Sequence, residues 1–247
     1  MILSYADFQS VLTEGRYDPG ILKCIFLAGG PGSGKSYVAE KLFDIPTNIF
    51  TSLSPYGLKL VNSDAIFEKL LQAAGISPDF TSLSSEDQDR VTGDSPTSFR
   101  SHAKKLTYGT KEKPGGFFHQ YLKGKLGMIV DGTGDSFQKI VRQKQQAEDA
   151  GYDTYLIFVE TTLEVAQARN AKRDRKVDPR VVETIWRDVQ RNLDVFLDLF
   201  GQNFLVVNNN PGGTDADLMA LFHKLMAQVL RRPIDNPLGR HWLDITK

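Results

Sequence analysis

The chain of 247 residues has one cysteine, no excess of either charge and no long uninterrupted hydrophobic segment. The single cysteine, Cys24, excludes a disulfide framework within the chain, and its apolar neighbours predict a small buried core residue. Thirty basic and thirty acidic residues give a net charge of zero, which excludes a strongly cationic surface overall but not a local basic patch. Because the N-terminus also lacks a basic segment followed by an apolar core, we expect a cytoplasmic protein without a membrane span.

Glycine is abundant in one short segment, residues 29–36, which reads Gly-Gly-Pro-Gly-Ser-Gly-Lys-Ser and completes a G-x-x-x-x-G-K-[ST] pattern. An apolar run at 24–28 precedes it and an amphipathic stretch at 37–43 follows, so the pattern has the strand–loop–helix setting of a phosphate loop. Lys35 would reach the β and γ phosphates, and Ser36 Oγ would ligate Mg²⁺. The predicted nucleotide-binding residues are Gly29, Gly30, Pro31, Gly32, Ser33, Gly34, Lys35, Ser36 and Tyr37. A glycine-rich turn without a ligand is the alternative.

Short apolar runs alternate with segments of helical period, which predicts an α/β fold of the P-loop NTPase or kinase type: a five-stranded parallel sheet with helices on both faces. Strands are expected at 24–28, 58–61, 127–131, 154–159 and 204–207. Helices are expected at 35–43, 64–74, 136–150, 162–175, 179–199 and 215–231. We interpret residues 1–20 as an N-terminal extension with a short helix, 21–231 as the domain and 232–247 as a tail that packs against the core or a partner. Residues 77–125 interrupt this alternation of strands and helices and contain only weak helical signals, at 98–106 and 117–122. They indicate an inserted lid or substrate segment.

Two predicted strands end in a carboxylate. Asp64 follows the strand at 58–61, where it could accept the proton of an attacking hydroxyl, although an Asp before a helix is also a common N-cap. Asp131 ends the strand at 127–131, where it could hold Mg²⁺ or help to fix the acceptor, although Asp and Gly are also ordinary turn residues. Asp135 could be the N-cap of the next helix.

Basic and amide side chains follow the later strands. Arg169 and Arg173 are four residues apart and would share one helical face, from which two guanidinium groups could neutralise a triphosphate, unless they are a solvated helix end. Asn209 follows the fifth strand, where it could contact an adenine base or simply form a turn. Trp186 and Trp242 are expected to be packing residues, because no aromatic series accompanies them.

Taken in order, four segments resemble the kinase domain of phage-type polynucleotide 5′-hydroxyl kinases and the related zeta-toxin group. They are residues 29–36, 61–64, 129–133 and 169–179. The resemblance covers about residues 22 to 200. It implies Lys35 and Ser36 on phosphate and Mg²⁺, Asp64 as general base, Asp131 as a second active-site carboxylate, and Arg173, with Arg169, in a lid over the donor phosphates.

One departure from the resemblance concerns the acceptor. Polynucleotide kinases commonly have an arginine one turn after the base aspartate, and Phe67 stands there in this chain. Candidates for binding an anionic acceptor lie in the insertion, at Arg100, His102, Lys104 and Lys105, although a solvated helix face is an alternative and His102 is expected at the surface.

We therefore expect an ATP- and Mg²⁺-dependent kinase that phosphorylates a hydroxyl of a polynucleotide 5′ end or of a nucleotide-like acceptor. A zeta-toxin-like kinase of a sugar nucleotide is one alternative. An ATPase or regulatory nucleotide-binding module is the other.

Overall fold

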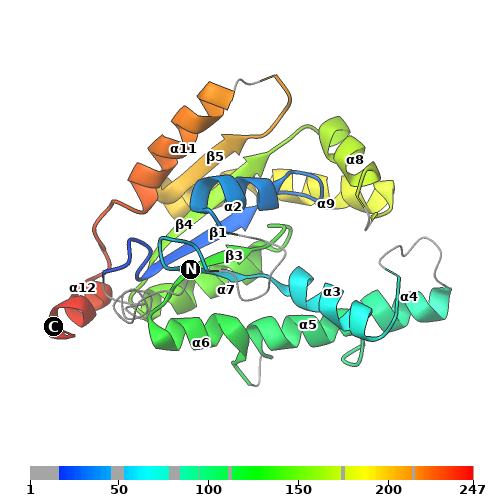
Figure 1. Cartoon of the computed structure of the whole chain (residues 1–247), viewed down its shortest axis with the longest axis horizontal. Coiled ribbons are helices and arrows are strands. Elements are labelled where there is room, and N and C mark those ends of the chain that lie inside the picture. The colour runs from blue at the N-terminus through cyan, green and yellow to red at the C-terminus, as the bar shows by residue number, and fades with distance from the viewer. Residues whose placement is uncertain are drawn as a thin grey trace, which may run out of the picture.

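The core of the computed structural model is a five-stranded parallel sheet. The structure describes residues 17–45, 53–77, 84–93, 95–110, 113–173, 176–212 and 215–246. The strand order is β2-β3-β1-β4-β5 (Figure 1). The strands are β1 (Lys23–Ala28), β2 (Leu58–Val61), β3 (Gly127–Asp131), β4 (Asp153–Glu160) and β5 (Phe204–Asn208). All five predicted strands are confirmed, and none of their ends differs from the prediction by more than about one residue.

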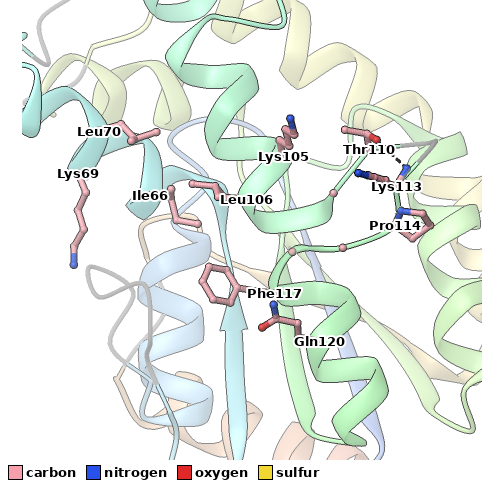
Figure 2. A pocket seen from close by; sticks show the side chains of 13 residues that line it. Ile66, Lys69, Leu70, Lys105, Leu106, Thr110, Lys113, Pro114, Phe117 and Gln120 are labelled. Atoms are coloured by element: carbon pink, nitrogen blue, oxygen red, sulfur yellow. Dashed lines mark hydrogen bonds between the residues drawn. The ribbon is translucent and has the colours of Figure 1, made fainter.

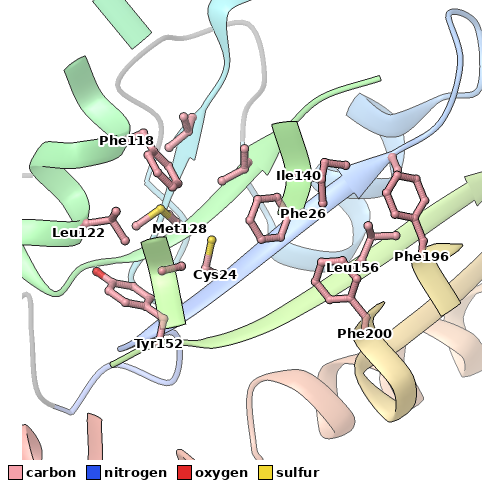
Figure 3. Packing of buried hydrophobic residues seen from close by; sticks show 14 of the residues in the cluster. Cys24, Phe26, Phe118, Leu122, Met128, Ile140, Tyr152, Leu156, Phe196 and Phe200 are labelled. Carbon is pink, nitrogen blue, oxygen red and sulfur yellow. The ribbon is translucent and has the colours of Figure 1, made fainter. Parts of the chain in front are cut away.

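Side chains of β1 alternate between two hydrophobic clusters, one on each face of the sheet, as the period of two in a strand requires. Ile25 and Leu27 pack with α2 (Lys35–Phe43) and α11 (Asp215–Val229). Cys24 and Phe26 belong to the cluster on the other face, which is formed with α7 (Phe137–Asp149), α9 (Pro179–Arg191) and α10 (Leu193–Phe200), as Figure 3 shows. Cys24 is fully buried, which confirms its predicted core position, and burial raises the pKa of its thiol.

Two predicted helices are wrong in length. The segment expected as one helix at 179–199 is divided into α9 and α10 at Asn192, whose side-chain amide donates hydrogen bonds to the carbonyls of Gly134 and Asp135 at 2.9 and 3.0 Å. A short 3₁₀ turn, η2 (Gly201–Asn203), then leads into β5. The segment expected as a helix at 162–175 is α8 (Leu163–Ala171), because the side chain of Asn170 bonds both the N–H and the carbonyl of Val177 and turns the chain back.

The insertion is helical and packs on the helix that follows β2. That helix is α3 (Ser63–Ala73), and the helices of the insertion are α4 (Ser85–Thr92), α5 (Phe99–Tyr108) and α6 (Gly116–Gly124). The weak helical signals are confirmed as α5 and α6. The sequence did not predict α4, because nearly all of its residues are polar or charged and only Val91 is buried there. A third hydrophobic cluster, built on Phe67 of α3 and Ala103 of α5, joins these helices. Figure 1 shows α4, α5 and α6 running along the lower part of the view.

The C-terminal segment ends in α12 (Pro237–Ile245), where Trp242 packs against the cluster that contains Cys24, as expected for a packing residue. The carboxylate of Asp153 accepts hydrogen bonds from the backbone N–H groups of Asp235 and Asn236, both at 2.8 Å. The predicted helix in the N-terminal extension falls mainly on residues 1–16, outside the described residues. None of the helices in the described part of the chain is both long and apolar enough to cross a membrane.

We predict that Asp153→Ala lowers the free energy of unfolding by about 1–2 kcal/mol, because two partly buried backbone N–H groups lose their charged acceptor. Chemical denaturation measures this loss. The control is Asp149→Ala, which removes an exposed carboxylate bonded to Gln145. Equal losses in the two variants would show that Asp153 does not hold the C-terminal segment.

Candidate functional site

The phosphate loop forms an open cradle at the carboxyl end of β1. Gly32 and Gly34 have φ values of 81° and 88°, a region that glycine adopts without strain. Gly34 is the N-cap of α2 and supplies no side-chain cap, and the first turn of α2 contains no acidic residue. The first N–H groups of α2 therefore point, uncapped by a side chain, toward the mouth of the loop, where an anion would bind them.

Neighbouring elements hold this loop from three sides. The N–H of Gly29 donates to the carbonyl of Thr133, just beyond β3, at 2.9 Å. The carbonyl of Ser33 accepts from the amide of Asn209 at 2.7 Å and from the guanidinium of Arg169 at 3.3 Å. Arg169 also donates to the carbonyl of Asn209 at 2.8 Å. In this structure Arg169 and Asn209 are therefore positioning residues of the loop, and their predicted roles at phosphate and adenine stay predictions.

Trp186 packs beside the loop, at Gly30, and its indole N–H donates to the carbonyl of Thr161 at 2.9 Å. This agrees with the packing role expected for it. Tyr37, the last residue of the predicted nucleotide-binding segment, is 40% exposed on α2, and Lys41 Nζ lies 5.8 Å from its ring centroid.

Lys35 and Asp131 both line the cleft and lie close enough for their charges to interact. Lys35 Nζ donates to the carbonyl of Gly29 at 2.6 Å, and burial lowers the pKa of its ammonium while Asp131 and Asp64 oppose this shift. Burial raises the pKa of Asp131 to about 6, with Lys35 acting in the opposite direction. The Oδ1 atom of Asp131 is buried and has no hydrogen-bond partner. This unsatisfied oxygen is placed to interact with a ligand in the cleft.

Asn62 connects the two carboxylates that the sequence singled out. Its amide donates to Asp131 Oδ2 at 2.9 Å, and its Oδ1 accepts from the N–H of Asp64 at 2.6 Å. Asn62 is thus the N-cap of α3, and Asp64 is the second residue of the helix. The alternative that Asp64 caps this helix is wrong. Asp135 is not an N-cap either, because Ser136 occupies that position in α7.

The carboxylate of Asp64 forms an ion pair with Arg100, which comes from α5 in the insertion. The guanidinium carbon of Arg100 also lies 5.2 Å from the centroid of the Phe67 ring, a cation–π geometry. Position 67 of this chain therefore holds an aromatic platform, and the arginine beside Asp64 comes from a different helix. No local sequence pattern links positions 64 and 100, which are brought together by the packing of α3 on α5.

A cleft of about 570 Å³ joins these parts. The predicted site residues that line it are Pro31, Gly32, Gly34, Lys35, Ser36, Asp64, Asp131 and Arg173. The sequence did not predict Asn62, Glu68, Tyr108 or Lys139 as lining residues. Asn62 lies within the segment 61–64, where only Asp64 was assigned a role, and the other three stand apart from recognisable motifs. Of the basic candidates in the insertion, Arg100 and Lys104 line the cleft, whereas His102 is exposed as expected.

The prediction that Arg169 and Arg173 share one helical face is wrong. α8 ends at Ala171, so Arg169 lies on the helix and Arg173 lies beyond its end, in the turn that Asn170 stabilises. This turn is what brings Arg173 to the wall of the cleft, while Arg169 is bonded to the loop.

A second cavity of about 740 Å³ lies on the other side of α5 and is lined mainly by apolar groups (Figure 2). Lys105, Leu106 and Phe117 contribute to it, with further residues of α3 and α6. Residues 104 and 105, although adjacent, therefore line different cavities.

The donor set of the cleft fits Mg²⁺ that binds together with a nucleotide. Within the described residues, no group of three or more His, Cys, Asp and Glu side chains could hold a metal ion. Magnesium commonly binds through one or two carboxylates together with phosphate oxygens and waters, so it does not need such a group. Asp131, with its unsatisfied buried oxygen, and Ser36 both line the cleft and match this coordination.

Comparisons with known proteins agree with this architecture. No curated protein sequence matches the chain. Among solved structures, a chain of the PezAT chromosomal toxin–antitoxin system of Streptococcus pneumoniae is similar, with 13% identity, a TM-score of 0.52, and coverage of 99% of this chain and 95% of that chain. A candidate kinase from Chloroflexus aurantiacus has 16% identity, a TM-score of 0.50, and coverage of 82% and 96%. At these identities the similarity establishes the fold alone.

The family model described as AAA domain (AAA_33) matches residues 24–196, more than half of the chain. This range extends from β1 to α10 and contains the phosphate loop, Asp64, Asp131, Arg169 and Arg173. The chain has an α/β P-loop NTPase fold and belongs to the AAA domain family AAA_33.

Proposed function

We propose that this protein is an ATP- and Mg²⁺-dependent phosphotransferase that moves the γ-phosphoryl group to a hydroxyl acceptor. The observation that carries the proposal is the placement of two carboxylates in one cleft with the phosphate loop, Asp131 beside Lys35 and Asp64 on the wall formed by α3. A site that only bound a nucleotide would not need the second carboxylate.

The side chains have separate tasks in this scheme. The loop N–H groups and Lys35 bind the phosphates of the donor, and Arg173 neutralises charge from the opposite wall. Asp64 orients the acceptor hydroxyl and takes its proton. At the same time the acceptor oxygen bonds to the γ phosphorus. The bond from that phosphorus to the bridging oxygen breaks, and ADP is released. Mg²⁺, which Ser36 and Asp131 would hold, supplies further charge neutralisation on the phosphates. Arg169 and Asn209 act through the loop that they position.

The acceptor that we propose is a polynucleotide 5′-hydroxyl or a smaller nucleotide. Its support is the cleft itself, which Arg100 and Lys104 of the insertion line together with Asp64, the proposed base. Labelled γ phosphate from ATP, offered to 5′-hydroxyl oligonucleotides, nucleosides, sugar nucleotides and water, distinguishes the candidates. Label on a sugar nucleotide alone would favour a zeta-toxin-like kinase, and label found only as free phosphate would favour an ATPase.

We predict that Lys35→Ala weakens ATP binding by about 100-fold, because a charge-assisted contact to phosphate is lost. Titration calorimetry with Mg²⁺ and ATP measures this change. Lys41→Ala, which removes another lysine of α2, should bind ATP like the wild type. Unchanged affinity in Lys35→Ala would contradict the proposed function as a whole.

Asp64→Asn should lower phosphoryl transfer by about 100-fold or more, because the amide cannot accept the hydroxyl proton. ATP affinity should change little, since the loop and Lys35 are intact. The transfer assay and the calorimetric titration are to be carried out on the same preparation, with Glu86→Gln on α4 as a control carboxylate. Transfer at the wild-type rate in Asp64→Asn would leave the protein without the proposed base.

Another prediction concerns the shape of the loop. A Cβ at Gly32 would lie 2.1 Å from the carbonyl oxygen of Ala166, and φ there is +81°. Gly32→Ala should therefore displace the loop and weaken ATP binding by about 10-fold or more. Gly75→Ala is the matched control, because its φ is +67° but no atom lies within 4 Å of the added Cβ. Equal ATP affinity in the two variants would show that the close approach to Ala166 does not shape the loop.

A further inference from the structure

One face of α5 supplies a row of functional groups to the cleft. Arg100, Lys104 and Tyr108 are spaced four residues apart, so they lie on the same helical face, and all three line the cleft. The next residue after Lys104, Lys105, lines the second cavity instead. The cleft face of α5 thus adds two cations on the side of Asp64.

Lys139 of α7 meets this row from another element. Its Nζ lies 4.3 Å from the ring centroid of Tyr108. Burial lowers the pKa of Lys139, and Lys104, Arg100 and Arg142 lower it further, with Asp135 as the opposing charge. We name Arg100, Lys104 and Lys139 the basic cluster. Positive charge exceeds negative charge around Lys139, an arrangement that a bound anion would relieve.

The acidic groups of the same cleft wall are Asp64 and Glu68 on α3 and Asp135 before α7. Of these, Asp64 forms the ion pair with Arg100. This pairing conflicts with the role of Asp64 as a base, because a carboxylate oxygen that accepts a hydrogen bond from a guanidinium group is a poor proton acceptor. The acceptor hydroxyl must therefore compete with Arg100 for the carboxylate of Asp64.

We propose that the acceptor carries an anionic group, a phosphate or phosphodiester, which binds the basic cluster and draws Arg100 away from Asp64. The inference rests on the proposed function and adds the role of the acceptor's phosphate, which is to release the base from its ion pair with Arg100. Water carries no such group and leaves the ion pair in place. The exchange thus favours transfer to the acceptor over hydrolysis of ATP, without a separate lid for excluding water.

The experiment compares Arg100→Ala with the wild type, both as full chains, in two reactions. The first is hydrolysis of ATP with Mg²⁺ and no acceptor. The second is transfer to matched acceptors that differ in the anionic group: a nucleoside against its 3′-phosphate, and a sugar against its nucleoside-diphosphate ester. The two pairs distinguish a nucleic-acid source of the phosphate from a sugar-nucleotide source.

In Arg100→Ala we expect ATP hydrolysis to increase by about 5-fold or more, because Asp64 is released and can orient water. The preference in kcat/KM for the phosphate-bearing acceptor should fall by about 10-fold or more, since a charge-assisted contact is lost. Lys104→Ala should reduce the same preference through KM. The controls are Lys105→Ala, which faces the second cavity, and Arg191→Ala, which removes an exposed ion pair with Asp188. Both should behave as the wild type.

Hydrolysis that stays constant or falls in Arg100→Ala would overturn the inference, because the arginine would then not restrain Asp64. An unchanged preference for the phosphate-bearing acceptor in both Arg100→Ala and Lys104→Ala would overturn it as well. In either case, transfer by the wild type that depends on Asp64 would leave the proposed function standing. A wild-type protein that neither transfers nor hydrolyses would instead refute the function on which the inference rests.

Discussion

The parallel pairing of β1 with β3 is the interaction on which the rest of the site depends. Leu27 is in register with Asp131, so both strands end at the same edge of the sheet. From there, the N–H of Gly29 bonds the carbonyl of Thr133 and ties the phosphate loop to the segment after β3. Because parallel strands end together beside their ligand crevice, this register brings Lys35 and Asp131 into one cleft.

Polar contacts extend this geometry outward from the sheet. Asn62 caps α3 and at the same time donates to Asp131, so one side chain positions both carboxylates. On the other side of the loop, the carbonyl of Ser33 is shared by Arg169 and Asn209, which come from α8 and from the end of β5. Hydrogen bonds therefore tie the phosphate loop to the segment after β3, to α8 and to the end of β5, so its conformation depends on elements that are distant along the chain.

The insertion adds further charged groups to the cleft of this core. Its helices pack on α3 through a small hydrophobic cluster that includes Phe67 and Ala103, and this packing presents one face of α5 to Asp64. The contact combines apolar burial, which holds the helix, with an ion pair and a cation–π contact to Arg100, which place its charge. A carboxylate paired in this way is held in position at the cost of its basicity, and this conflict is the basis of the proposed exchange.

The sequence by itself determined the five strands, the phosphate loop and the positions of Asp64 and Asp131, because each depends on a local pattern: an apolar run, a glycine spacing or a strand followed by a carboxylate. It also predicted Cys24 as a core residue and two of the three helices in the insertion. Only the tertiary structure decided the strand order, the N-cap at Asn62, the turn at Asn170 that separates Arg169 from Arg173, and the approach of Arg100 and Lys139. These features join residues that are distant along the chain or depend on a side-chain hydrogen bond, and neither kind leaves a periodic signal in the sequence.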